Sequence, residues 1–406
     1  MIKLKLPVFD ALRVTAFRNY RIVSGVSLFG SRMQAVVIAW LAWEVTKSGD
    51  WVGAIGFAEF MPIALIAPFS GSFVNKLGPR KIILASQMIG ILHSTLLIFI
   101  LRLGGLSPLN LLCLAILIGL IDGCFHPANL AITGELVEKS LLSSAAVVNS
   151  AVQNFCFFLG PLAAGVLLTM FSPLYACLTS LACRVLFMVA IGKISSRSRG
   201  YNSVHEQAGR ISVSDDGWKF FFSNNQTSAI LIGCASVSLT ARALIPVLSA
   251  FVGETLHEGS EMFAAGVGLI GAGAMAGSFL QGGERTELGC LKLVRNGLLY
   301  TAASLFGLAI FRSPEVVLLV LFSLGLTIGV NGTGTQAYIQ MTSFDKPRGK
   351  IFGIYVMVLN GSVALGGLFI GSASSYLGSK WVLVACAVLC VAAALIVTIS
   401  WRNARK

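Results

Sequence analysis

Twelve long apolar segments restrict the fold of this chain more than any other feature. They cover residues 22–45, 51–74, 80–103, 108–133, 142–170, 173–194, 225–252, 262–284, 288–311, 314–340, 348–376 and 379–401, with short polar links between them. Each is long enough for a helix to cross the hydrocarbon core of a bilayer, which takes about 20 residues. The sequence therefore predicts an all-α integral membrane protein with twelve transmembrane helices.

Composition and charge distribution support this prediction. Only 12% of the residues are charged, about half the share in a soluble domain. The net charge of +13 could suit nucleic acid, but 23 Lys and Arg residues fall in links on the side of the N-terminus and only 4 in the opposite links. Basic links face the cytoplasm. We expect a multi-pass protein of the cell inner membrane with both termini in the cytoplasm, no cleaved signal peptide and no nucleic-acid partner.

The chain also repeats itself. Four glycines, at positions 119, 123, 160 and 165, each have a second glycine 206 residues later, and the first span repeats with a shift of 210, so that Arg32 corresponds to Arg242. We predict two pseudo-symmetric six-helix halves, residues 1–194 and 223–406, joined by a cytoplasmic linker, 195–222. Two such parallel halves place a substrate site between them at the middle of the bilayer.

The link between the second and third spans carries a family resemblance. GSFVNKLGPRK (71–81) resembles the loop signature of the major facilitator superfamily, G-x-x-x-D-x-x-G-R-[RK], and Asn75 stands where the family has aspartate. The residues that match are Gly71, Gly78, Arg80 and Lys81, with Pro79 inserted. The resemblance implies the major facilitator fold and a gating loop that holds the outward-open state, which the uncharged Asn75 should weaken.

Further segments resemble one subgroup of that superfamily. FRNYRI (17–22), FHPAN (125–129), VVNSAVQN (147–154) and QMTSFDKPRGKIFGIY (340–355) resemble the bacterial exporters that include the enterobactin exporter and the macrolide efflux proteins. The resemblance implies transport of a small molecule and a central cavity lined by the first, fourth, seventh and tenth spans.

Few ionisable residues fall within the spans, and each is costly there unless it is paired or faces water. They are Arg32, Glu59, His93, Asp122, His126, Arg184 and Arg242. A rise of 1.5 Å per residue puts most of them near mid-membrane, roughly 16–21 Å from the external ends of their spans. Arg32, Asp122 and Arg242 lie on the first, fourth and seventh spans, so we expect them at the central cavity.

Each candidate has a functional and a structural interpretation. Arg32 and Arg242 suit an anionic substrate, because guanidinium groups bind oxyanions in pairs and stay charged, but either could instead form a structural ion pair. Substrate contacts are also expected from Asn331, Gln336 and Gln153, although Gln153 could simply join helices. Asp122, Glu59 and His126 are the candidates for proton coupling. The structural interpretation is favoured for two of them, Glu59 as a fixed partner of Arg32 and His126 as a packing residue.

These observations favour a secondary transporter that exports a small anionic or amphipathic compound, siderophore- or drug-like, in exchange for protons. Uptake of an organic anion or siderophore, lysophospholipid flipping, and a membrane sensor or transferase are the alternatives. We expect no enzyme activity, because no loop is long enough for a catalytic domain. No metal or cofactor is expected, and no GxxxxGK[ST] motif for ATP occurs. We expect the protein to be a monomer. Its other expected partners are membrane lipid and protons.

Overall fold

The computed structural model describes residues 7–138, 141–193, 215–222, 224–280, 286–343 and 348–403, and within them every regular element is a helix. Twelve helices are long and apolar enough to cross a membrane, which confirms the predicted fold class. The first half contains α1 (Thr15–Thr46), α2 (Gly49–Leu77), α3 (Pro79–Leu103), α4 (Pro108–Leu136), α5 (Leu142–Met170) and α6 (Pro173–Lys193). The second half contains a seventh span in four parts, α8 (Asn225–Val237), η4 (Ser238–Arg242), α9 (Leu244–Ala250) and η5 (Phe251–Leu256), and then α10 (Ser260–Leu280), α11 (Glu287–Ile310), α12 (Pro314–Thr342), α13 (Arg348–Leu377) and α14 (Ser379–Asn403).

Two short helices precede the halves. η1 (Pro7–Arg13) comes before α1, and α7 (Asp215–Phe222) comes before α8. α7 occupies the last eight residues of the predicted linker, and its Phe220 and Phe221 are buried against the second half. The rest of that linker lies outside the described residues.

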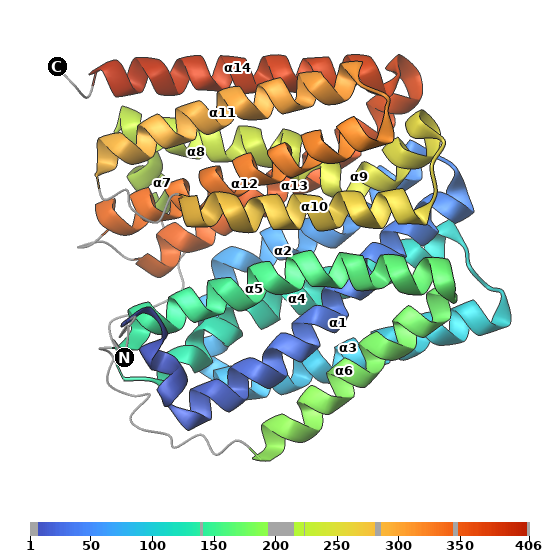
Figure 1. Ribbon diagram of the computed structural model, residues 1–406. Helices are drawn as coiled ribbons and strands as arrows, with labels where there is room; N and C mark the ends of the chain where they lie inside the picture. The colour runs from blue at the N-terminus through green and yellow to red at the C-terminus, as the bar shows by residue number, and fades with distance from the viewer. Residues whose placement is uncertain are drawn as a thin grey trace, which may run out of the picture.

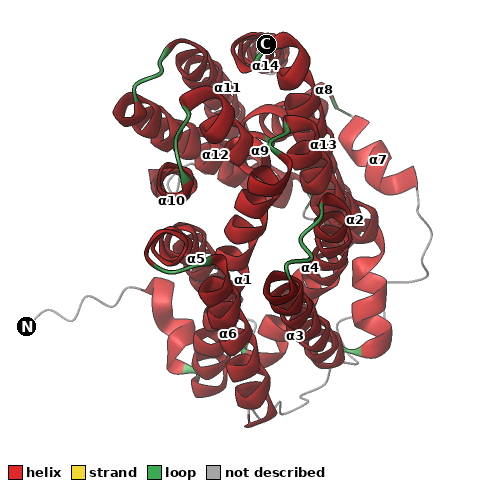
Figure 2. Ribbon diagram, turned by 90° about the vertical axis from the view of Figure 1, so that its right-hand side faces the viewer, coloured by secondary structure: helices red, strands yellow, loops and turns green. Residues whose placement is uncertain are grey.

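The two halves lie side by side. In Figure 1 the first half is below and the second half above, and α1 begins at the same end of the bundle at which α14 ends. We call this the terminal end and the opposite one the distal end. The main contacts between the halves are α2 with α13 and α5 with α10, and both pairs are visible end-on in Figure 2.

The repeated glycines show that the halves are built alike. Gly119 of α4 lies against the backbone of α2, and its repeat Gly325 of α12 lies against the backbone of α10. Gly160 brings α5 against α1, and its repeat Gly366 brings α13 against the seventh span. A side chain at any of these positions would keep the helices apart, so the repeat in the sequence encodes equivalent close helix contacts.

The seventh span departs from this symmetry. It was expected as one continuous helix, but η4 and η5 are π-helical segments, whereas its counterpart α1 is α-helical over its whole length. π-helical turns are rare and occur often at functional sites. Arg242 is the last residue of η4, so this departure lies at a predicted site residue.

Small residues and aromatic rings close the distal end. Gly49 and Gly53 of α2 lie directly against the backbone of α13. Trp40 of α1 stacks on Phe263 of α10 with ring centroids 5.7 Å apart, and Trp43 lies against Gly253 in η5. Toward the terminal end α5 and α10 separate (Figure 1). The halves therefore meet tightly at the distal end.

Candidate functional site

A charged pocket lies in the first half. It lies between α1, α2, α3 and α4. Its lining consists of Ser31, Arg32, Gln34, Ala35, Ile38, Glu59, His93, Ile118 and Asp122. The structure thus brings together three of the predicted site residues, Arg32, Glu59 and Asp122, from three different helices.

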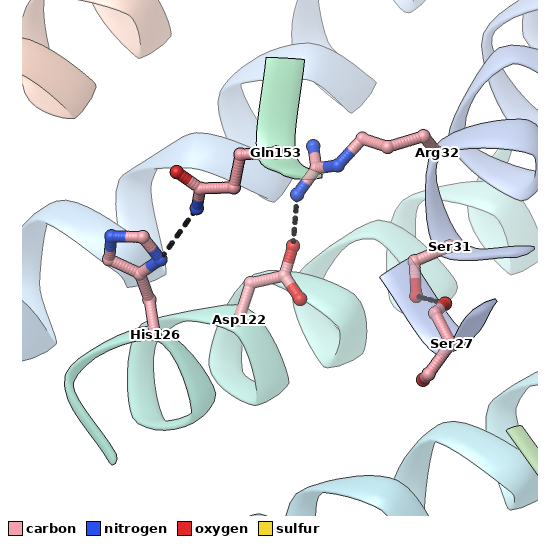
Figure 3. Close-up of polar contacts among 6 residues, drawn as sticks. All are labelled: Ser27, Ser31, Arg32, Asp122, His126 and Gln153. Carbon is pink, nitrogen blue, oxygen red and sulfur yellow. Dashed lines mark hydrogen bonds and ion pairs between the residues drawn. The ribbon is translucent and has the colours of Figure 1, made fainter. Parts of the chain in front are cut away.

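Arg32 and Asp122 form an ion pair across this pocket. Nη2 of Arg32 lies 3.5 Å from Oδ2 of Asp122, and Figure 3 shows the two side chains pointing toward each other. The guanidinium also stacks over the ring of Phe157 on α5, 4.4 Å from its centroid. Both charged side chains keep about a quarter of their surface exposed, 23% for Arg32 and 26% for Asp122. The pair is therefore positioned by packing yet open to exchange with a ligand.

Glu59 lies in the same pocket without a base of its own. No Lys, Arg or His nitrogen of the described residues lies within 4.0 Å of its carboxylate. The backbone of α2 at Glu59 packs directly on Gly119 of α4, one turn before Asp122. Two carboxyl groups therefore share one arginine, and only Asp122 is paired with it.

His126 and Gln153 extend this polar row toward the terminal end. Nε2 of Gln153 lies 3.4 Å from Nδ1 of His126, and Figure 3 shows the two side chains beside the Arg32–Asp122 pair. His126 follows Asp122 by one turn of α4 and is exposed. The helix positions and this contact place His126 between the pocket and the terminal end.

Arg242 occupies the equivalent position in the second half with a different partner. Its Nη2 donates to the backbone carbonyl of Ile328 on α12, at 3.4 Å. Ile328 is the residue that the 206-residue repeat matches to Asp122. The guanidinium lies against Gly332, and no carboxylate of the described residues lies within 4.0 Å of it. Arg242 is therefore a half-buried cation without an acid partner in the described part of the chain.

Asn331 and Gln336 do not share one environment. The amide of Asn331 is buried, donates to the carbonyl of Thr327 at 2.9 Å, and faces Gly297 of α11. Gln336 is exposed and follows Gly332 by one turn on α12. Gln336 therefore lies on the face of α12 that contacts Arg242 of η4. Asn331 instead faces the contact between α12 and α11.

The predicted gating loop is described in part. Gly78 separates α2 from α3 with a φ of +80°, which L side chains rarely adopt. Nη2 of Arg80 donates to the carbonyl of Ile191 on α6 at 3.2 Å, and Lys81 is exposed. Gly71 and Asn75 belong to α2, but the side chain of Asn75 and the surroundings of Gly71 lie outside what the structure describes.

The prediction missed a buried polar cluster that forms one wall of the pocket. Oε1 of Gln34 accepts hydrogen bonds from Ser94 at 2.9 Å and Ser180 at 2.8 Å, and its Nε2 lies 3.3 Å from Nδ1 of His93. Nε2 of His93 lies 3.2 Å from the carbonyl of Leu114. These groups come from four helices. In the sequence, only the adjacent polar residues His93 and Ser94 could have indicated such a cluster.

Comparison with known proteins identifies the family. The family model described as transmembrane secretion effector matches residues 7–404. A staphyloferrin A transporter of Staphylococcus aureus (strain NCTC 8325 / PS 47) is 22% identical over 373 residues, 89% of this chain and 90% of that protein. An uncharacterized MFS-type transporter of Bacillus subtilis (strain 168) is 24% identical over 354 residues, 81% of this chain and 80% of that protein.

Solved structures show the same fold. A POT family transporter in complex with 5-aminolevulinic acid superposes with a TM-score of 0.74 at 12% identity, over 96% of each chain. An inward-facing, unoccupied bacterial homologue of the human lysosomal transporter Spinster gives 0.71 at 13% identity, over 97% of this chain and 98% of that one. With the family match over nearly the whole chain, these results confirm the resemblance: the protein belongs to the transmembrane secretion effector family, whose fold is that of the major facilitator superfamily, and it is a multi-pass membrane transporter.

Proposed function

We propose that this transporter exports a small anionic or amphipathic compound, in exchange for protons, by alternating access between its two halves. The observation that carries the proposal is the unequal distribution of charge between equivalent positions. The proton-binding candidates, Asp122 and Glu59, lie in the first half, and Arg242, which has no acid partner among the described residues, lies in the second. Separate positions for the proton and the anion allow each to bind in a different conformation.

In this proposal Arg242 is the first contact of an anionic substrate. A guanidinium that is half removed from water and lacks a counter-charge gains more from an oxyanion than one already paired with Asp122. Gln336 on the same face of α12, and Gln153 across the cavity, are suited to bind polar groups of the substrate. Asn331 packs between α12 and α11, on the side of α12 away from Arg242.

The family description and one relative support the direction and the substrate class. The matched family is described as a secretion effector, and the S. aureus relative is named for staphyloferrin A. A siderophore-like compound is accordingly the first class of substrate to test.

The excess of basic residues near the terminal end favours a cytoplasmic location for that end. A cysteine introduced at Ser203 should then resist an impermeant thiol reagent in intact cells, and rapid labelling would reverse the orientation.

The ion pair itself favours a second candidate, uptake of an anion together with protons. Arg32 can bind Asp122 or a substrate anion, but not both at full strength. Protonation of Asp122 releases Arg32, so a proton and an anion that both use this pair strengthen each other's binding. Mutual strengthening favours transport of both ligands in one direction, whereas exchange requires that they exclude each other.

The experiment that tests the proposal measures whether proton binding strengthens or weakens substrate binding. Mass spectrometry of the medium of a deletion strain identifies the compound whose export is lost. Its affinity for the purified protein is then measured from acid to neutral pH. Weaker binding at acid pH, with proton-driven accumulation in inverted vesicles, supports export by exchange. Tighter binding at acid pH, with accumulation in right-side-out vesicles, overturns it in favour of uptake.

A further inference from the structure

A second arginine of the first half is buried without an acid partner among the described residues. Arg184 of α6 is 1% exposed, and its Nε and Nη2 atoms have no hydrogen-bond partner among the described residues. Its Nη1 lies so close to Gly90 of α3 that a β-carbon there would overlap it. Glycine at position 90 thus makes room for a guanidinium that the described residues leave uncompensated. A lone buried charge is costly within a membrane, so its retention calls for a nearby opposite charge.

The opposite charges lie beyond the polar cluster around Gln34. Gly90 is one turn from His93 and Ser94 on α3, and Ser180 is one turn from Arg184 on α6. Because Oε1 of Gln34 accepts from two hydroxyl groups, its amide nitrogen must face His93. Nδ1 of His93 then accepts, and its Nε2–H donates to the carbonyl of Leu114. His93 is therefore held neutral, and an uncharged layer separates Arg184 from the pocket.

The charges on the far side of that layer are those of the pocket. Gln34 and His93 line the pocket together with Arg32, Glu59 and Asp122, and Arg32 already pairs with Asp122. With both carboxyl groups ionised, the described lining of the pocket carries two negative charges, on Glu59 and Asp122, and one positive charge, on Arg32. Arg184 restores neutrality to this part of the first half.

The repeat shows that this arrangement is specific to one half. At the positions that correspond to Gln34, His93 and Arg184, the second half has Leu244, Leu299 and Cys390. Helix packing alone thus requires neither the arginine nor the polar layer. Both occur only in the half that contains the two carboxyl groups of the pocket.

We propose that Arg184 is a positioning residue that keeps the carboxyl groups of Asp122 and Glu59 ionised from outside the pocket, through the neutral layer of Gln34 and His93. The charged and titratable groups on the helices around it are Arg32 from α1, His93 from α3 and Cys183 from its own helix, and Asp122 from α4 lies in the pocket beyond the layer. Within the described residues, α5, which also contacts α6, adds no charged group to this set. The substrate never touches Arg184.

Charge removal at Arg184 tests this role. At an effective dielectric constant of about 20, a unit charge that acts on a carboxyl group from beyond hydrogen-bond distance shifts its proton equilibrium by on the order of one pH unit. Arg184→Gln should therefore raise the pH at which the pocket carboxyl groups are half protonated by about one unit, whereas Arg184→Lys, which keeps the charge, should leave it nearly unchanged. Arg102→Gln, at the exposed end of α3, is the matched control and should cause no shift.

Infrared titration of the protonated carboxyl band in lipid nanodiscs measures this midpoint without substrate. The pocket signal is the part that disappears in Asp122→Asn and Glu59→Gln. An unchanged midpoint in Arg184→Gln overturns the proposal, since a purely structural role predicts a lower melting temperature alone. If Arg184→Gln does not fold, Glu59→Gln added to it should restore folding because the interior charge balances again, and failure to restore it also overturns the proposal. The role in transport rests on the proposed proton coupling: a shifted midpoint with pH-independent transport would refute the coupling and leave the role of Arg184 intact.

Discussion

Gly53 lies in the contact between α2 and α13, where a single added methyl group should alter the conformational equilibrium. A β-carbon there would lie 2.8 Å from the carbonyl oxygen of Gly367 and 3.3 Å from the Cα of Gly371. Both atoms belong to the backbone of α13, which cannot turn aside as a side chain can. Overpacking of this kind costs about 1–3 kcal/mol, so Gly53→Ala should shift the equilibrium between closed and open distal ends by about 5–150-fold toward open.

Spin labels on the distal loops of the two halves, at Gly105 and Arg312, report this shift as a longer distance in a double electron–electron resonance experiment. Two control variants grade the effect. A β-carbon at Gly268 would come closest to the side chain of Leu162, at 2.8 Å, which can rotate away, and would reach the backbone oxygen of Phe158 only at 3.7 Å, whereas one at Gly192 would meet nothing within 4 Å. We expect a small shift for Gly268→Ala and none for Gly192→Ala. Equal distance distributions for Gly53→Ala and Gly192→Ala would refute the view that this seam closes the distal end.

Three further predictions concern the site and the gating loop. Asp122→Asn or Arg32→Gln alone should lower stability by about 1–3 kcal/mol, because each strands a partly buried partner at 3.5 Å, and the double variant should regain most of the melting temperature. A double variant as unstable as the sum of the singles would contradict the pair. Phe157→Ala should lower stability by about 1 kcal/mol, seen as a lower melting temperature, through loss of its cation–π contact with Arg32, whereas Phe155→Ala, exposed on the same helix, should not. Gly78→Ala should cost about 1–3 kcal/mol at a φ of +80°, seen as a lower melting temperature.

The spans were predictable because each depends on a local property, a run of apolar residues long enough to cross a bilayer. The repeat was predictable for a similar reason, because glycines at equivalent positions bring equivalent helices together. The π-helical segments of the seventh span were not predictable, because its residues, up to Val252, continue the same apolar run. Whether such a run is α- or π-helical depends on what the neighbouring helices contact, which hydropathy does not encode.

The candidate site shows the same limit at the level of side chains. Asn331 and Gln336 were expected together because both are polar residues of the tenth span. Five residues apart, however, they lie about 140° apart around a helix, so the spacing could have shown that they face different neighbours. Gln34 offers no such signal. It becomes part of the pocket wall only when α1, α3 and α6 bring His93, Ser94 and Ser180 to it.

The departures from the repeat locate the function better than the repeat does. The two halves share their arginines, Arg32 and Arg242, in equivalent positions, yet each arginine meets a different atom at the same place on the partner helix: a carboxylate of Asp122 in one half and the backbone carbonyl of Ile328 in the other. Glu59 likewise has Ala265 as its counterpart. Since the glycine contacts that build the two halves are matched, the scaffold does not require these differences. A symmetric scaffold that has Asp122 and Glu59 in one half, and Ile328 and Ala265 at the equivalent positions of the other, can bind a proton on one side of its cavity and an anion on the other, and relative motion of the halves then changes access to both ligands at once.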